Sequence, residues 1–126
     1  MDFDIEIGFV KKYIKKEYQD RLIFELKSKK HREKAVSRFS HFSENILKNS
    51  FKRCDMSEFL NLFCEKNNVK EKCYIISSEE HDGKSIVLSD ALECCKNSYM
   101  AMILISEKFV LVKEEYEKKG IFLLSK

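Results

Sequence analysis

Length, composition and charge limit the class of protein before any motif is considered. The chain has 126 residues, of which 44% are hydrophobic and 36% charged, so it suits one domain with an apolar core and not a disordered chain. The net charge of +3 combines a basic stretch up to Arg53 with a mildly acidic remainder. The longest strongly apolar run, Met100 to Ile105, is too short for a bilayer span of about 20 residues, and the first residues lack the pattern of a signal peptide.

Cysteine usage indicates a reducing compartment. The cysteines are odd in number, two of them are adjacent, and none form a C-x-x-C pair: Cys54, Cys64, Cys73, Cys94 and Cys95. The histidines are not spaced with them as zinc ligands would be. We therefore predict buried, reduced thiols in a cytoplasmic protein, with no membrane partner, no metal and no cofactor.

Two amphipathic helices are predicted before residue 48. Apolar residues recur at helical spacing in two stripes, Val10, Ile14, Tyr18, Leu22 and Leu26, then Ala35, Val36, Phe39, Phe42, Ile46 and Leu47. Residues 28 to 31 separate the stripes, although one long bent helix also fits. Residues 22 to 26 would suit a strand as well, but the flanking charges keep the helical period and favour a helix.

A third helix is predicted over residues 55–68. Asp55-Met56-Ser57-Glu58 has the spacing of a capping box, in which two side chains satisfy free backbone N–H groups. Met56, Phe59, Leu60, Phe63 and Cys64 then share one face. Asn67-Asn68 is expected to end this helix, since Asn tolerates the left-handed backbone found there.

After residue 72 the apolar period changes to two, which is typical of strands. Strands are predicted over residues 73–77, 86–88, 99–106, 109–112 and 121–124. Asp82-Gly83 is a turn signal between the first two, and Glu107-Lys108 turns the third into the fourth. Ser89-Asp90 is expected to cap a short helix whose Ala91, Leu92 and Cys95 face inward.

These elements predict an α+β fold. Two or three N-terminal helices pack on one face of a four- to five-stranded antiparallel or mixed sheet, with one helix inserted between the second and third strands. Residues 1–126 form one domain, with a helical half over 5–68 and a sheet-rich half over 72–125. An uncovered edge at residues 86–88 or 121–124 would favour a homodimer.

Two groups of side chains are candidates for contact with a partner protein. Arg38, His41 and Asn45 have i, i+3, i+7 spacing, which places them on one polar helix face. Glu79, Glu80, His81 and Asp82 form an acidic hairpin tip. Each group also has an ordinary structural explanation, as the solvated face of a helix and as a solvated turn.

The basic first half offers an alternative, nucleic-acid binding. Its cations cluster as phosphate binding requires: Lys11, Lys12, Lys15, Lys16, Lys27, Lys29, Lys30 and Arg32, followed by Lys34 and Arg38. Acidic residues interrupt them at ion-pairing spacing, which favours an ordinary ion-paired helix surface. A small-ligand site walled by Tyr13, Tyr18, Tyr74 and Tyr99 is a third hypothesis.

No catalytic motif names a reaction, so an enzyme is possible only as an unfamiliar one. The sequence therefore favours a small non-enzymatic interaction module, such as an immunity protein, inhibitor or regulator of bacterial type. Its unevenly signed halves would steer it toward a charged macromolecular partner.

Overall fold

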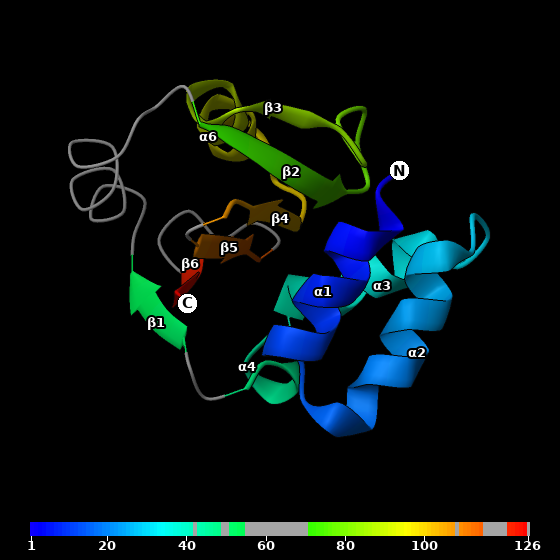
Figure 1. Ribbon diagram of the computed structural model, residues 1–126. Coiled ribbons are helices and arrows are strands. Elements are labelled where there is room, and N and C mark those ends of the chain that lie inside the picture. Colours follow the sequence, from blue (N-terminus) through cyan, green and yellow to red (C-terminus); the bar gives the residue numbers. More distant parts are fainter. Residues whose placement is uncertain (42, 49–50, 55–70, 108, 115–120, 126) are drawn as a thin grey trace.

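Four helices precede the first strand in the part of the chain that the structure describes. The structure is a computed structural model that describes residues 1–41, 43–48, 51–54, 71–107, 109–114 and 121–125 (Figure 1). The helices are α1 (Phe3–Tyr13), α2 (Lys16–Lys27), α3 (Arg32–His41) and α4 (Ser43–Ile46). Residues 28 to 31 separate α2 from α3, and residues 22 to 26 are helical, so both predictions are confirmed. Among the described helices, none combines the length and apolar composition that crossing a bilayer requires.

The first predicted stripe belongs to two helices and not to one. Ile14 leaves the helical conformation, with φ −97° and ψ 139°, and pairs in a β-bridge with Leu47. The Lys15 N–H donates to the Ile46 carbonyl at 2.8 Å, and the Lys48 N–H donates to the Tyr13 carbonyl at 2.8 Å. No glycine or proline marks this break, which depends on pairing with a segment more than thirty residues further along the chain.

The described residues form six strands of one antiparallel sheet, in the order β1-β6-β5-β4-β2-β3. They are β1 (Phe51–Cys54), β2 (Lys72–Ser77), β3 (Ser85–Val87), β4 (Met102–Ile105), β5 (Phe109–Lys113) and β6 (Ile121–Ser125). Helix α6 (Leu88–Asn97) connects β3 to β4 and crosses over β2, which lies between them. The predicted α+β class is confirmed, with the N-terminal helices on the sheet and a helix inserted between two strands.

The strand β1 lies inside residues 5–68, for which the sequence predicts only helices. Its four residues pair with β6, from Phe51 opposite Leu124 to Cys54 opposite Ile121. A four-residue segment carries too little periodicity to identify a strand, so its pairing became visible only in the fold. This strand also covers β6, which is therefore not an edge, while β3 is an edge among the described strands, as expected.

Alternate residues of the central strands face opposite layers. Tyr74 and Ile76 of β2 join the core under α1, α2 and α3. Cys73 and Ile75 join a second core under α6. Helices therefore cover both faces, with α1–α4 on one side of the sheet and α6 on the other (Figure 1). This explains why β2 is apolar on both faces, as the prediction of a central strand required.

Local boundaries differ from the expected ones at two places. Helix α6 begins at Leu88 after Val87, so Ser89-Asp90 lies within its first turn and does not cap it. Strand β4 begins only at Met102, so Tyr99 and Met100 precede it. Gly83 has φ 77°, which confirms the turn, and a Cβ there would lie 2.6 Å from Cγ of Met1.

The predicted third helix, including its capping box and the two asparagines, lies outside the described residues, as does Lys108 of the predicted turn. The charged stretch before β6 is described only at Glu114.

Candidate functional site

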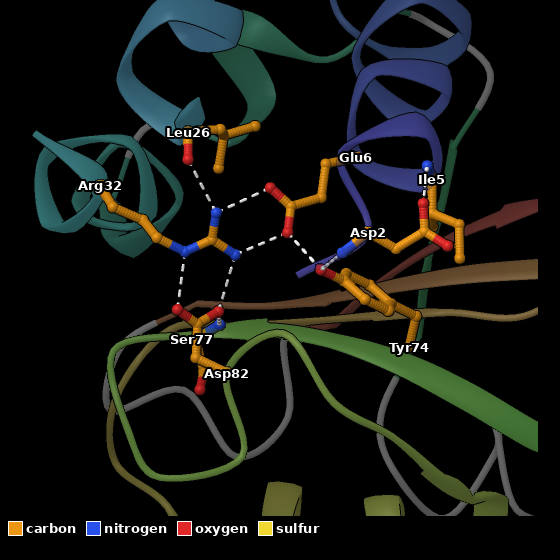
Figure 2. Close-up of polar contacts among 8 residues, drawn as sticks. All are labelled: Asp2, Ile5, Glu6, Leu26, Arg32, Tyr74, Ser77 and Asp82. Atoms are coloured by element: carbon orange, nitrogen blue, oxygen red, sulfur yellow. Dashed lines mark hydrogen bonds and ion pairs between the residues drawn. The ribbon is translucent and has the colours of Figure 1, made fainter. Parts of the chain in front are cut away.

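A buried ion-pair network ties the helical layer to the β2–β3 loop (Figure 2). Arg32, the first residue of α3, donates to the two carboxylate oxygens of Glu6 at 2.7 and 2.6 Å. It also donates to the two carboxylate oxygens of Asp82 at 2.6 and 2.9 Å, and to the Leu26 carbonyl oxygen at 2.9 Å. All five N–H groups of the guanidinium are therefore used inside the protein.

Further hydrogen bonds complete this network. The Tyr74 hydroxyl donates to Oε2 of Glu6 at 2.5 Å, and the backbone N–H of Ser77 donates to Oδ1 of Asp82 at 3.0 Å. The Asp2 N–H donates to the Tyr74 hydroxyl oxygen at 3.1 Å. Figure 2 shows these groups converging from α1, α3, β2 and the loop. The network thus determines where the loop lies relative to the helices.

Electrostatics keep Arg32 charged and Tyr74 neutral. Burial opposes the charge of Arg32, but hydrogen bonds from its guanidinium to Glu6 and Asp82 outweigh burial and raise its pKa above the ordinary value. Burial, together with the hydrogen bond to Glu6, raises the pKa of Tyr74 to about 12. The structure therefore gives Arg32 a structural role in place of the phosphate contact expected from the sequence.

A second ion pair joins α2 to α3. Arg38 donates through Nε and Nη2 to the carboxylate of Glu25 at 2.8 and 2.9 Å. This hydrogen bonding outweighs burial and holds the pKa of Glu25 below its ordinary value, and it raises the pKa of Arg38. The Glu25 side chain is 4% exposed and that of Arg38 is 32% exposed. Arg38 thus anchors one helix to the other while part of it stays at the surface.

That exposed part lies along a groove of about 560 Å³, which we call the α3 groove. Its lining comes from α3 and from the residues that follow β2 and precede β4: Glu33, Lys34, Val36, Ser37, Arg38, Ser78, Met100 and Ala101. Two of its three charged side chains are basic. The lining therefore combines a net positive charge with the apolar side chains of Val36, Met100 and Ala101.

A groove of about 490 Å³, the α6 groove, lies on the other side of the sheet. Its charged and titratable lining comes from the β2–β3 loop and α6: Glu79, Glu80, His81, Asp90, Glu93 and Cys94. The described lining residues include four carboxylates and neither lysine nor arginine. The Ser98 hydroxyl donates to Glu79, which ties the loop to the segment between α6 and β4.

The α6 groove holds a cysteine and a histidine, but their arrangement does not activate a thiol. Burial and the carboxylates of Asp90, Glu80 and Glu79 raise the pKa of Cys94, whereas a nucleophilic cysteine needs a lowered one. Within the described residues, no three His, Cys, Asp or Glu side chains form a group that could hold a metal ion. The groove is suited to attract a cationic group and not to thiol chemistry.

Two exposed side chains lie in the chain segment that connects the lining of one groove to that of the other. Ser98 lines the α6 groove, Met100 lines the α3 groove, and Tyr99 lies between them in sequence. Tyr99 is 56% exposed and Met100 is 39% exposed. The Met100 N–H donates to the Ser98 hydroxyl at 3.1 Å, and the Lys113 ammonium donates to the Met100 carbonyl at 2.7 Å. We call residues 98–100 and the two grooves the sheet-end surface.

The three residues of the expected helix face lie in two described segments, α3 and α4. Arg38 lines the α3 groove, whereas His41 is the last residue of α3 and Asn45 lies exposed on α4. Asn45 is not among the described lining residues of the two grooves.

The acidic hairpin tip is brought together only in part. Glu79, Glu80 and His81 line the α6 groove, while Asp82 turns toward Arg32. Nε2 of His81 lies 3.5 Å from Oε1 of Glu80. Three of the four predicted residues therefore remain available at the sheet-end surface, and Asp82 holds their loop in place.

The lysines of the nucleic-acid alternative lie at two separate places. Lys11, Lys12, Lys15 and Lys16 lie where α1 ends and α2 begins; Lys27, Lys29 and Lys30 lie at the other end of α2. All are exposed except Lys15, which is half-buried. The structure therefore separates one predicted basic stretch into two surfaces.

The four tyrosines do not form a common wall. Tyr13 and Tyr74 are buried in the core under the helices, and Tyr18 packs against it. Tyr99 stands exposed at the sheet end. Neither the α3 groove nor the α6 groove is lined by any of the four.

Sequence reasoning missed Glu6 and misread Arg32, although a signal was present. Glu6 lies one helical turn before Val10, and Arg32 lies one turn before Val36, so both occupy apolar stripes. A charged residue in such a stripe is buried only when paired. This signal identifies a buried ion pair but not its partners. The exposure of Tyr99 and Met100 had no signal, since both fit the apolar run of a strand.

No protein-family model, curated protein or solved structure matches this chain. Its function is therefore argued from the geometry of the site.

Proposed function

We propose that this protein is a non-enzymatic interaction module that binds another protein through the sheet-end surface. The observation that carries this proposal is the exposure of Tyr99 and Met100, two large neighbouring side chains, on a backbone held by hydrogen bonds. Tyrosine and methionine are enriched in protein interfaces, and tyrosine is frequent at their energetic centres. Neighbouring exposed apolar groups gain free energy when a partner covers them.

Charge supports one orientation of that partner. The α6 groove carries four carboxylates, and the α3 groove carries Lys34 and Arg38. A partner with a basic side chain on one side of an apolar anchor and an acidic side chain on the other would match both grooves. Such complementarity raises the association rate and excludes wrongly charged partners.

Rigidity of the surface also supports binding. The bonds from Arg32 to Asp82 and from Ser98 to Glu79 hold the β2–β3 loop that lines the α6 groove. A surface that is ordered before binding loses less conformational entropy when the complex forms. The ion-pair network thus contributes to the proposed function without touching the partner.

The form of module that we propose is an inhibitor, immunity protein or regulator of bacterial type, acting in the cytoplasm. Burial raises the pKa of Cys73 and of Cys95 to about 12, so both remain protonated, unreactive thiols at neutral pH. Such thiols suit a reducing compartment. The raised pKa of Cys94 supports a role without thiol catalysis.

Affinity capture with paired variants tests this proposal. We expect the wild-type chain to retain one stoichiometric partner protein and the Tyr99→Ser/Met100→Ser variant to bind it about tenfold more weakly, a loss of about 1.4 kcal/mol. Phe24→Ser is the matched control, because Phe24 is 61% exposed on α2 and is not among the described lining residues of either groove. It should bind like the wild type. Cross-links to the partner should map to residues 78–80 and 98–100.

Two outcomes would overturn the proposal. One is capture that survives the double substitution, or that the Phe24 control weakens equally. The other is a wild-type chain whose mass in solution is that of two copies and returns to one copy in the double variant. The occupant of the surface would then be a second copy of this chain.

A further inference from the structure

The end of the helical layer opposite the ion-pair network carries a lysine cluster that the proposed protein-binding surface does not use. Lys11 and Lys12 lie in the last turn of α1, Lys15 precedes α2, and Lys16 is its first residue. Glu6, near the other end of α1, belongs to the network beside the sheet end. Since α1 has 11 residues, the two regions are separated by roughly half of a helix about 16 Å long.

The fold adds a fifth lysine that the sequence does not place there. The β-bridge between Ile14 and Leu47 brings the end of α4 against the α1–α2 junction. The Lys48 ammonium donates to the Lys11 carbonyl oxygen at 3.2 Å, so this cation lies at the end of α1. We call Lys11, Lys12, Lys15, Lys16 and Lys48 the basic corner. The ends of α1 and α4 and the start of α2 lie together in Figure 1.

These charges are not neutralised by the described protein groups around them. In the described part of the chain, none of the five ammonium groups has a carboxylate oxygen within 4.0 Å. The acidic residues Glu17 and Asp20 follow on α2 but do not pair with them. By contrast, the buried Arg32 and the partly exposed Arg38 of the helical layer have carboxylate partners. Lys12 lies over the Tyr13 ring, which leaves its charge in place, so five cations without a carboxylate partner among the described residues favour a polyanionic ligand.

The chemistry around the corner distinguishes between polyanions. Among the described residues, the exposed large hydrophobic side chains are Met1, Phe24, Tyr99 and Met100, and none belongs to the corner. A lipid surface is usually bound through apolar side chains that enter the membrane interface beside the cations. A nucleic-acid backbone needs only positioned cations, because its phosphates lie at regular spacing outside the bases.

We propose that the basic corner binds the phosphate backbone of nucleic acid without reading its sequence. The lysines supply the contacts, and no aromatic side chain of the corner is exposed for base stacking. Binding should therefore be strongly dependent on salt. Five lysine–phosphate contacts correspond to a slope of log affinity against log salt of at most about −4.5 for duplex DNA.

Two charge-matched variants test this inference. Lys11→Gln/Lys12→Gln/Lys16→Gln removes three exposed cations from the corner, and Lys27→Gln/Lys29→Gln/Lys30→Gln removes three exposed cations from the other end of α2. Binding of a short labelled DNA duplex of mixed sequence is measured by fluorescence anisotropy from about 50 to about 200 mM salt. Circular dichroism confirms that both variants fold.

We expect the corner variant to bind about tenfold more weakly at low salt and to lose about 2.7 from its salt slope, since three phosphate contacts are removed. The control variant should change the affinity less than about twofold. Lys48→Gln should lower the slope by about one, which tests whether the fold places this lysine at the site.

The inference is overturned if the two triple variants weaken binding equally, since a general charge effect would then explain it. It is also overturned if the wild type shows no salt-dependent affinity for DNA. Vesicles of phosphatidylcholine with phosphatidylserine provide the third arm. Binding to these vesicles through the corner, without binding to DNA, would replace nucleic acid by a lipid surface.

Discussion

The helices on the two faces of the sheet are held by different kinds of interaction, although the same strands contribute side chains to both faces. Under α1–α3 the core contains three charged residues, Glu6, Glu25 and Arg32, all engaged in ion pairs. Under α6 the core cluster consists of apolar side chains and two thiols, Cys73 and Cys95, and the one buried charge described beside it is Lys113, whose ammonium donates to the Met100 carbonyl oxygen. Ion pairs are directional and orient the elements that they join, whereas apolar packing responds mainly to volume. The helical face positions the loop of the sheet-end surface, and the α6 face mainly contributes buried area.

Substitution at Arg32 should have the largest effect. Arg32→Met leaves the carboxylates of Glu6 and Asp82 without their counter-charge, and Glu6 is 1% exposed. We expect the free energy of unfolding to fall by about 3–5 kcal/mol, measured by urea denaturation followed by circular dichroism. A loss below about 1 kcal/mol would show that the network is not a determinant of stability.

A triple variant tests whether the unpaired buried charges cause this loss of stability. Glu6→Gln/Arg32→Met/Asp82→Asn removes both carboxylate charges along with the guanidinium, so no unpaired charge stays buried. It should recover most of the stability lost by Arg32→Met, because the cost of the single substitution is mainly an uncompensated charge. A triple variant as unstable as the single one would contradict that explanation.

Within the apolar cluster under α6, the volume of each side chain should decide its contribution to stability. Leu104 is fully buried in the core under α6. Leu104→Ala should lower the free energy of unfolding by about 3 kcal/mol through lost burial and a residual cavity. Leu104→Met, the control of conserved volume, should lose less than about 1.5 kcal/mol. If both variants lost the same amount, this face would not be close-packed as described.

Tyr74 offers a smaller effect that depends on alkaline pH. Tyr74→Phe removes the hydrogen bond to the buried Glu6 carboxylate and should cost about 1.5–2 kcal/mol at pH 7. The pKa of Tyr74 rises in the folded protein from 10 to about 12, so the stability that Tyr74 contributes is full below pH 10 and declines as the pH approaches 12.

The dependence of the free energy of unfolding on pH separates the contribution of the Tyr74 hydroxyl from other contributions. Urea midpoints of wild type and Tyr74→Phe, compared between pH 9 and 12, should converge as the phenol ionises. A constant difference across that range would show that the Tyr74 proton is not held more tightly in the folded state.

The smallest expected effect concerns Glu25. Glu25→Gln should cost about 1 kcal/mol at pH 7, because its partner Arg38 is partly exposed and solvent screens the pair. The pKa of Glu25 is held below its ordinary value of 4.5, so its contribution is present above pH 4.5 and is lost as the pH falls through the lowered value. The difference from wild type should therefore vanish in acid. A difference that persists at pH 2 would assign the effect to packing and not to charge.

Several features of both faces of the sheet could be predicted from the sequence. The change of period after residue 72 predicted the strands, and the apolar character of residues 73–77 predicted that β2 is central. The inward positions of α6 were also predicted correctly at Ala91, Leu92 and Cys95. These successes share a cause, since helical and strand periods are properties of neighbouring residues.

The candidate site was predictable only in part. Arg38, Glu79, Glu80 and His81 were named from the sequence, and all four line the grooves of the sheet-end surface. Their separation onto opposite faces of the sheet required the strand order. The exposed pair at residues 99–100 was assigned to a strand, because an apolar run does not show where pairing begins.

By itself, the sequence determined the kind and the buried face of the longer described elements, although not of β1, because burial follows from the period of apolar residues along a segment. Only the tertiary structure decided which distant groups meet: Arg32 with Glu6 and Asp82, 26 and 50 residues away, and Lys48 with the end of α1. A charged side chain can pair with any opposite charge that the packing brings near. Its partner therefore depends on the arrangement of whole elements and not on its own neighbours in the chain.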